Sequence, residues 1–316
     1  MPNSACPLCT NMAVKMYLWR GYRIQKCRTC GLEFLEERPS ESQLAAFYQD
    51  ISQKKMVNSE IRAKKIDYSF GKYLENYSRH SSKTNPRFAD VGGGVGYYAA
   101  AAQKHLSSVF LVDYADDALN FARDELQVKN VIRADAQNSH RALAPHSIDY
   151  LLFRHILEHV IDPIGCIQNL CKSLSTGGVL QIETPNVASY EHLIRPHIIV
   201  ENFKILKSDN KAMSTLDLLY QAGRKSLSGI NPPKHLWGFT PDSLTSLLRQ
   251  CDMKILDVLC KPFGDPVFDP LYYDFHSLSN RNGLGKLYYY VEQLGTFAFK
   301  NSGSNLVVLA QHNQSS

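Results

Sequence analysis

The chain has 316 residues, with 44% hydrophobic residues, 21% charged residues and a formal net charge of +5. This is the composition of an ordinary globular protein, long enough for one large domain and a small module. No apolar run approaches the roughly 18 residues of a membrane span. The first residues lack the features of a secretory signal, and the mild positive charge does not require nucleic acid. We therefore expect a cytoplasmic protein without a membrane span.

Two CxxC pairs, CPLC and CRTC, open the sequence and supply four cysteines: Cys6, Cys9, Cys27 and Cys30. Zinc prefers four tetrahedral thiolates, and a CxxC turn directs two sulfurs toward one centre. The segment between the pairs is typical of two strands joined by a turn at Gly21. We predict a zinc ribbon over residues 1–35 that binds structural Zn²⁺; a pair of redox-active dithiols is the alternative.

Residues 36–85 are expected to form a helical linker or lid. A short helix follows Ser40, and residues 60–80 carry apolar side chains near helical spacing. The basic residues of the ribbon are followed by the acidic stretch GLEFLEERPSE. This charge pattern favours a docking or substrate-covering role for the ribbon over binding of nucleic acid.

From Pro86 onward, short apolar strands alternate with helices. We expect strands at 87–91, 109–114, 130–135, 148–153, 177–186, 253–259 and 305–311, and helices at 97–106, 115–126, 162–175 and 240–252. Asp162 and Thr240 are the expected N-caps of the last two helices. The βαβ alternation predicts a parallel sheet with helices on both faces. This domain spans 86–316, with insertions at about 187–231 and 262–303.

The stretch FADVGGGVG contains most of the first strand of this domain and the four glycines that come after it. Glycines here allow a nucleotide to approach the backbone closely. The NAD fingerprint fails when counting starts at Gly92, because Tyr97 takes the third glycine position. Counting from Gly94 puts Ala99 there, which nominally fits but starts four residues beyond Asp90 at the strand end. The better pattern is an acidic residue, Asp90, followed by alternate glycines. A carboxylate suits a cationic ligand better than a pyrophosphate, and Asp113 ends the second strand where a ribose-hydroxyl acceptor is expected.

On these motifs the chain resembles the class I S-adenosylmethionine-dependent methyltransferases. The resemblance implies a Rossmann-like, doubly wound α/β fold with a mostly parallel seven-stranded sheet, preceded here by the small zinc ribbon. RHILEHVIDP, LSTGGVLQIETPN and KHLWGFTPDSL look like a branch of the family that joins such a ribbon to the methyltransferase core. That branch acts on small molecules, sugars and surface glycans. The implied donor-binding residues are Asp90, Gly92, Gly94, Gly96, Asp113, Asp135, Ala136 and Arg154.

Candidate catalytic residues follow the fourth strand of the domain. His155, Glu158 and His159 lie there, and His235 lies in a later loop. Methyl transfer to a hydroxyl or carbon acid needs a base near neutral pKa, which a histidine supplies. Alternatively, Glu158 and His159 only fix the loop by hydrogen bonds. Similar methyltransferases of the ubiquinone-biosynthesis and small-RNA types bind a divalent metal through ExxEH, but His155 replaces the first glutamate here. The inverted zinc-protease motif HxxEH is rejected, because no long helix carries it.

The combined expectation is an S-adenosylmethionine-dependent methyltransferase acting on a hydroxyl or carbon of a small molecule. A sugar or glycan precursor is the favoured acceptor, and nucleic acid is not an expected partner. Two rival hypotheses remain: a ribbon-guided enzyme for RNA or protein, and a non-catalytic module that binds the methyl donor.

Overall fold

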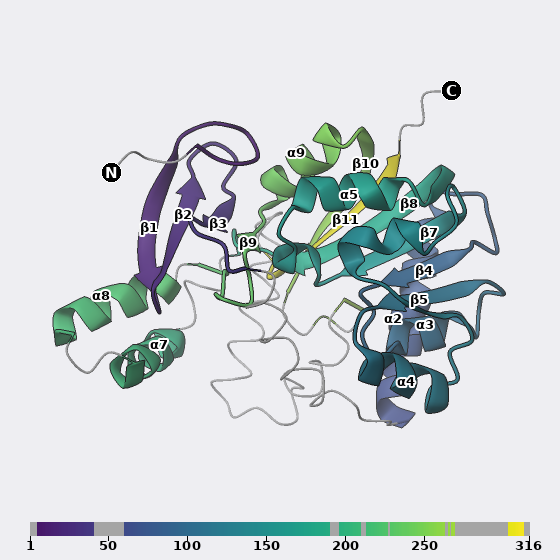
Figure 1. Cartoon of the computed structure of the whole chain (residues 1–316), viewed down its shortest axis with the longest axis horizontal. Coiled ribbons are helices and arrows are strands. Elements are labelled where there is room, and N and C mark those ends of the chain that lie inside the picture. The colour runs from purple at the N-terminus through teal and green to yellow at the C-terminus, as the bar shows by residue number, and fades with distance from the viewer. Residues whose placement is uncertain are drawn as a thin grey trace.

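The computed structural model describes residues 5–40, 60–189, 196–209, 213–226, 228–262, 265, 267–268 and 303–312. The helix predicted after Ser40 and most of the insertion predicted at about 262–303 lie outside these residues. Two sheets organise the described chain, a large one in the main body and a small one near the N-terminus (Figure 1). None of the helices in the described ranges is long and apolar enough to cross a membrane.

The large sheet has seven strands in the order β10-β11-β8-β7-β4-β5-β6. Their bounds are β4 (Phe88–Val91), β5 (Val109–Asp113), β6 (Val131–Arg133), β7 (Ile148–Arg154), β8 (Leu174–Pro185), β10 (Met253–Lys261) and β11 (Asn305–His312). Strands β6, β5, β4, β7 and β8 are parallel, whereas β11 pairs antiparallel with β8 and β10. The predicted Rossmann-like, mostly parallel seven-stranded sheet is confirmed. The chain reverses direction across the sheet at β4, and ligands of such sheets bind at the carboxyl ends of the strands beside that point.

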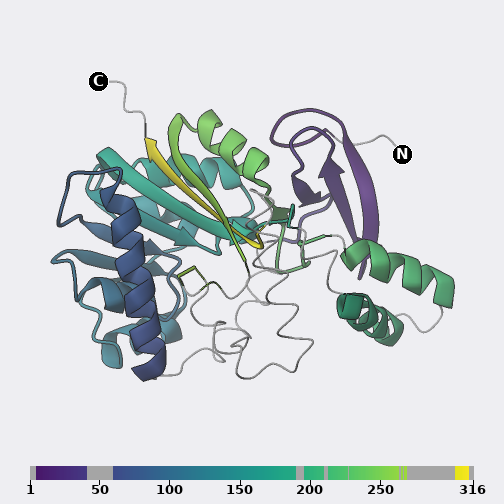
Figure 2. The same cartoon turned by 180° about the vertical axis from the view of Figure 1, so that it is seen from behind.

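Helices cover both faces of this sheet (Figures 1 and 2). Their bounds are α2 (Glu60–Ser78), α3 (Tyr97–Ala102), α4 (Asp116–Asp124), α5 (Pro163–Cys171) and α9 (Pro241–Gln250). Helices α2, α3 and α4 contribute to one buried cluster, and α5 and α9 to the other. On the first side, the ring of Tyr73 stacks on that of Tyr98 with centroids 5.4 Å apart. Because α3 is rich in alanine, it can pack closely on the sheet.

The expected helix caps are present. The Asp162 side chain accepts a hydrogen bond from the Gly165 N–H at 3.0 Å, and Pro163 occupies the first turn of α5. Thr240 and Ser243 form a reciprocal capping box at the start of α9. The predicted helix at 97–106 is shorter than expected, because α3 ends at Ala102 and a turn follows. Local capping chemistry therefore fixes where α5 and α9 begin.

The N-terminal sheet contains the predicted hairpin and two strands that were not predicted. Strands β1 (Ala13–Trp19) and β2 (Tyr22–Cys27) are joined by a two-residue turn, and β3 (Glu33–Leu35) follows. Both turn residues, Arg20 and Gly21, have positive φ, as a tight I′ hairpin requires. The fourth strand is β9 (Trp237–Gly238), which lies about 200 residues later in the chain and pairs with β3. The ribbon is thus completed by the main domain.

The region predicted to interrupt the strand–helix alternation carries two helices. Helices α7 (Pro196–Asp209) and α8 (Thr215–Ser226) lie beside the ribbon, away from the large sheet (Figures 1 and 2). Arg224 of α8 donates hydrogen bonds from Nε and Nη2 to the Met16 carbonyl of β1, at 3.1 and 2.8 Å. The small sheet is therefore held by the main domain on two sides, through α8 and through β9.

Candidate functional site

The glycine loop joins β4 to α3 through left-handed backbone. Gly92, Gly94 and Gly96 have φ values of 72°, 55° and 79°, which side-chain-bearing residues rarely adopt. A Cβ on Gly92 would lie 2.6 Å from the side chain of Ile156, whereas a Cβ on Gly94 would meet nothing within 4 Å. The loop is therefore closely packed at Gly92 and open at Gly94, so a ligand can approach the backbone at Gly94.

Two aspartates flank this loop at neighbouring strand ends. Asp113 accepts the Gly94 N–H through Oδ2 at 2.8 Å and the Ala115 N–H through Oδ1 at 3.0 Å. Asp90 is only 3% exposed, and its Oδ2 has no hydrogen-bond partner among the residues that the structure describes. Burial, reinforced by the Asp113 carboxylate, raises the pKa of Asp90 to about 7. A buried acceptor without a partner fits a ligand that brings a donor or positive charge.

The third expected acidic position lies at the same edge of the sheet, just after β6. Asp135 is exposed, and its side chain caps a short 3₁₀ helix, η2 (Ala136–Arg141), by accepting the Gln137 N–H at 2.8 Å. Ala136 is partly buried and packs against the main core. Both residues are therefore at the edge that carries the glycine loop, and the Asp135 carboxylate also holds its own loop in place.

Arg154 ends β7 at the same edge, but it is already engaged with protein groups. Its Nε lies 2.8 Å from Oε2 of Glu183, and its Nη2 donates to the Phe268 carbonyl at 2.8 Å. The guanidinium also sits over the ring of Tyr98, 5.3 Å from its centroid. Glu183, which is 1% exposed, was not predicted from the sequence. Its position at the end of a strand, in ETPN, was the available signal.

The four predicted catalytic residues come together beyond the end of β7. Glu158 lies in η3 (Leu157–His159), a short 3₁₀ helix, and is 2% exposed. Its Oε1 is 3.5 Å from Nδ1 of His155 and 3.6 Å from Nε2 of His159. The ring of His235 lies 5.1 Å from that of His159, centroid to centroid. The structure thus joins residues 155–159 to a histidine more than 70 positions away.

Hydrogen bonds to residues outside the cluster hold Glu158 and His159 in place. The Thr184 hydroxyl donates to Oε2 of Glu158 at 3.0 Å, and Nδ1 of His159 lies 2.6 Å from the Lys234 carbonyl. Neither Thr184 nor Lys234 was predicted; the only signals were the position of Thr184 near the end of β8 and that of Lys234 next to His235. The backbone of His155 has a φ of 53°, a conformation that costs free energy and often occurs at functional sites.

The ionisation of Glu158 depends on the groups around it. Although burial opposes ionisation, the surrounding imidazoles, His159 foremost, keep the pKa of Glu158 well below its ordinary value. Burial lowers the pKa of His235 to about 3, so this ring is neutral at physiological pH. Glu158, His159 and His235 also offer ligand atoms within 4.8 Å of one another, a spacing that could hold a metal ion.

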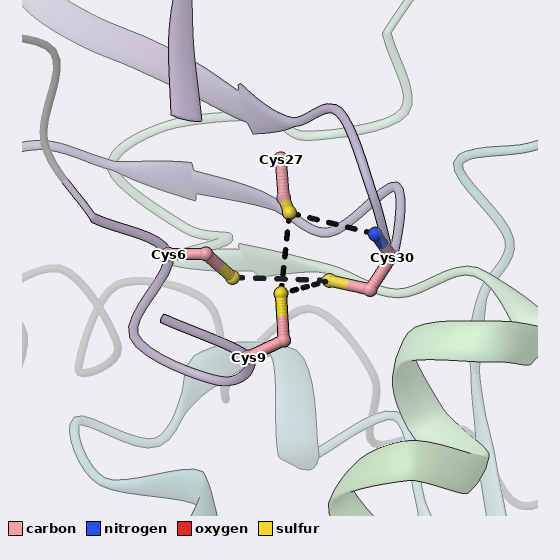
Figure 3. Close-up of side chains that lie close together, drawn as sticks. All are labelled: Cys6, Cys9, Cys27 and Cys30. Atoms are coloured by element: carbon pink, nitrogen blue, oxygen red, sulfur yellow. Dashed lines mark hydrogen bonds between the residues drawn. The ribbon is translucent and has the colours of Figure 1, made fainter. Parts of the chain in front are cut away.

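The four N-terminal cysteines form a second metal-compatible cluster (Figure 3). The Sγ atom of Cys9 lies 3.4 Å from that of Cys27 and 3.7 Å from that of Cys30, and the Sγ atoms of Cys6 and Cys30 are 3.8 Å apart. Four sulfurs at about 2.3 Å from a tetrahedral zinc ion would be separated by about 3.8 Å. The N–H groups of Thr29 and Cys30 also point at the Cys27 sulfur, at 3.4 Å. The sulfur geometry therefore fits zinc.

A cavity of about 480 Å³ lies at the junction of the ribbon and α9. Ribbon residues such as Lys26 and Arg28 line it together with Thr240 and Asp242 at the start of α9. None of its lining residues belongs to the glycine loop or to the histidine cluster. It is therefore distinct from both parts of the site described above.

Comparison with known proteins defines the class to which this fold and site belong. The family model described as a methyltransferase domain matches residues 63–258, which is more than half of the chain. The chain belongs to this methyltransferase domain family, and its sheet is the Rossmann-like sheet of class I S-adenosylmethionine-dependent methyltransferases.

Curated relatives match parts of the chain. The ubiquinone biosynthesis O-methyltransferase of Neisseria meningitidis is 28% identical over 128 residues, 38% of this chain and 54% of that protein. That of Vibrio cholerae is 31% identical over 109 residues, 33% of this chain and 44% of that protein. The biotin biosynthesis bifunctional protein BioHC of Cellvibrio japonicus is 24% identical over 164 residues, 52% and 32% respectively. The matches span from about a third to about half of these relatives.

Solved structures resemble the chain at low sequence identity. A possible histamine N-methyltransferase from Thermotoga maritima aligns with a TM-score of 0.48 and 14% identity, covering 86% of this chain and 99% of that one. A SAM-dependent methyltransferase from Archaeoglobus fulgidus aligns with a TM-score of 0.46 and 16% identity, covering 76% and 91%.

Proposed function

We propose that the chain is an S-adenosylmethionine-dependent methyltransferase that methylates a hydroxyl or carbon of a small molecule, with a sugar or glycan precursor as the favoured acceptor. Membership of the methyltransferase domain family supports the reaction. The observation that carries the proposal is the meeting of the glycine loop with two carboxylates, Asp90 and Asp113, at adjacent strand ends. The motifs shared with the zinc-ribbon branch support the acceptor class, and we assign the enzyme to the cytoplasm.

In this proposal the donor lies along the carboxyl ends of β4, β5 and β6. The partnerless Oδ2 of Asp90 would face the ammonium group, because ionic pairing satisfies a buried carboxylate. Asp113 would accept from the ribose hydroxyls. An ionised carboxylate has about four acceptor sites, and the backbone fills two of them here. Asp135 and Ala136 would lie beside adenine. Arg154, held by Glu183, would close this edge at β7.

The base in this proposal is His155, oriented by Glu158. Of the rings beside Glu158, His155 is the more accessible, with a side chain 32% exposed against 14% for His159. His159 is engaged through Nδ1 with the Lys234 carbonyl, and burial keeps the pKa of His235 too low for a base at neutral pH. The Glu158 carboxylate beside Nδ1 would hold the ring and stabilise the imidazolium that forms when Nε2 takes the acceptor proton. S-adenosylmethionine supplies an activated methyl group when bound.

We assign the ribbon a structural zinc ion held by Cys6, Cys9, Cys27 and Cys30. Four protein ligands leave no open position on the metal, so it would supply folding free energy rather than chemistry. We divide the chain into this ribbon at 1–35, a helical linker or lid at 36–85 and the methyltransferase domain at 86–316, with insertions at about 187–231 and 262–303.

Two measurements test the proposal. Calorimetry on the zinc-loaded protein should show binding of S-adenosylhomocysteine and none of NADH. Incubation with isotope-labelled donor and fractionated cell extract should place the label in nucleotide sugars or polysaccharide. Label in RNA or protein would favour a ribbon-guided macromolecular methyltransferase, and donor binding without any labelled product would favour a non-catalytic module. Binding of NADH alone would overturn the donor assignment.

A further inference from the structure

The segment 228–240, here called the His235 segment, contacts both the ribbon and the histidine cluster. On the ribbon side, β9 pairs with β3, with Trp237 opposite Phe34 and Gly238 opposite Glu33. The Leu35 N–H also donates to the Leu236 carbonyl at 3.2 Å. The edge strand of the cysteine-bearing module therefore fixes this segment directly.

A second contact joins the segment to a residue of the cysteine cluster itself. The Thr240 hydroxyl donates to the carbonyl of Cys30 at 2.8 Å. The neighbouring Gly31 has no room for a side chain, since a Cβ there would lie 2.9 Å from Cγ2 of Thr240. A movement of the CRTC turn would consequently displace Thr240.

On its other side the same segment holds the cluster. The Leu236 N–H donates to the Glu158 carbonyl at 2.8 Å, and Nε1 of Trp237 donates to the Val160 carbonyl at 2.7 Å. Leu236 thus bonds the ribbon through its C=O and the Glu158 backbone through its N–H. Arg38, which follows the ribbon, donates to the Ile161 carbonyl at 3.3 Å and lies over the Trp237 ring, 4.4 Å from its centroid.

These contacts make the ribbon part of the scaffold of the histidine cluster. A module of about 30 residues with four thiolate ligands depends on its metal for folding. If the cysteines release their metal, β3 and the CRTC turn lose their geometry. The His235 segment would then keep its contacts to the residues around Glu158, the hydrogen bond from the Val187 N–H to the Phe239 carbonyl and the cap of α9, but would lose those to the ribbon.

We propose that metal binding at the four cysteines positions His235 against Glu158 and His159, with Leu236, Trp237 and Thr240 as the positioning residues that connect the two sites. The inference rests on the zinc assignment and on the histidine cluster proposed above. The ribbon would then complete the histidine cluster, which is the part of the site proposed to act on the acceptor. The glycine loop would not depend on the ribbon.

The test is hydrogen–deuterium exchange of the full chain, before and after removal of the metal with a chelator. Zinc content and binding of S-adenosylhomocysteine are measured first, so that failure of the zinc or donor assignment is seen separately. We expect peptides within 230–240 to exchange about tenfold faster or more after stripping, with no change in β5. If residues 13–35 lose protection while 230–240 keeps it, the proposal is overturned.

A pair of variants in the metal-loaded protein decides the matter if stripping loosens the whole molecule. Thr240→Val removes both the cap of α9 and the hydrogen bond to Cys30, whereas Ser243→Ala weakens the same cap and keeps that bond. Thr240→Val should speed exchange in 230–240 and lower kcat without changing donor affinity. Apart from the amide of Thr240, whose acceptor it removes, Ser243→Ala should do neither, and equal effects from both variants on residues 230–239 would overturn the proposal.

Discussion

Two buried carboxylates show how differently the two halves of this site are built. Asp90 has another carboxylate, Asp113 of the neighbouring strand, beside it, and its Oδ2 has no protein partner in the described chain. Glu158 is surrounded by His155 and His159 of its own segment and by Thr184 and His235 of two others. Burial raises the pKa of Asp90 to about 7, while the imidazoles lower that of Glu158. In the proposed function the ligand supplies the cation that pairs with Asp90, whereas the protein itself supplies the polar partners of Glu158.

The largest expected effect comes from removing a cysteine. Cys30→Ser should abolish most zinc binding, because a structural site of this kind contributes ~10–16 kcal/mol and depends on all four thiolates. Affinity for S-adenosylhomocysteine should change little, since the glycine loop follows β4 of the large sheet and the cysteines belong to the small one. Zinc is measured by emission spectroscopy and affinity by calorimetry. Cys171→Ser, at a buried cysteine of α5, is the control that should keep its zinc.

The next largest effect is expected at Glu158. Glu158→Gln preserves shape but removes the charge that orients His155, so kcat should fall by about 10²–10³ with an unchanged dissociation constant for the donor. The control is Asp149→Asn, at a buried aspartate near the opposite end of β7, bonded to Lys83 and Ser175. An equal loss of kcat in both variants would assign Glu158 a structural role only.

Substitution of Asp90 should give the opposite pattern, with a larger effect on donor affinity than on kcat. Asp90→Asn should weaken binding of S-adenosylhomocysteine about 10- to 100-fold, because a hydrogen bond to a charged group contributes ~1.5–3 kcal/mol. The fall in kcat at saturating donor should be smaller than for Glu158→Gln. Calorimetry and steady-state kinetics separate the two. Unchanged donor affinity would remove Asp90 from the binding site.

The pH dependence is the smallest expected effect. Because the pKa of Asp90 is raised to about 7, the carboxyl becomes protonated, and loses its attraction for an ammonium group, as the pH falls through 7. Donor affinity should then drop about tenfold per pH unit below that point. It should stay level above pH 7 until the ligand's own ammonium titrates. The Asp90→Asn protein, titrated in the same buffers, should lack this drop near pH 7.

The sequence predicted the features that neighbouring residues determine. The strand–helix alternation, the caps at Asp162 and Thr240 and the left-handed glycines each depend on residues only a few positions apart. The contacts between distant segments around the site were not predicted. Pairing of β3 with β9, and of Arg154 with Glu183, joins segments that only the folded sheet brings together. A Ser, Thr or Lys residue at such a position has no recognisable signal in the neighbouring sequence, because its role depends on a distant segment that packs against it.

The strand that β9 adds to the ribbon also bears on how the protein is made. Phe34 pairs with Trp237 about 200 positions later, so a ribbon emerging from the ribosome has an open edge until most of the polypeptide has been synthesised. Such edges recruit other strands, and early metal capture would not close this one. Exchanging the N-terminal module between homologues would therefore require the downstream dipeptide and its flanks to be exchanged as well.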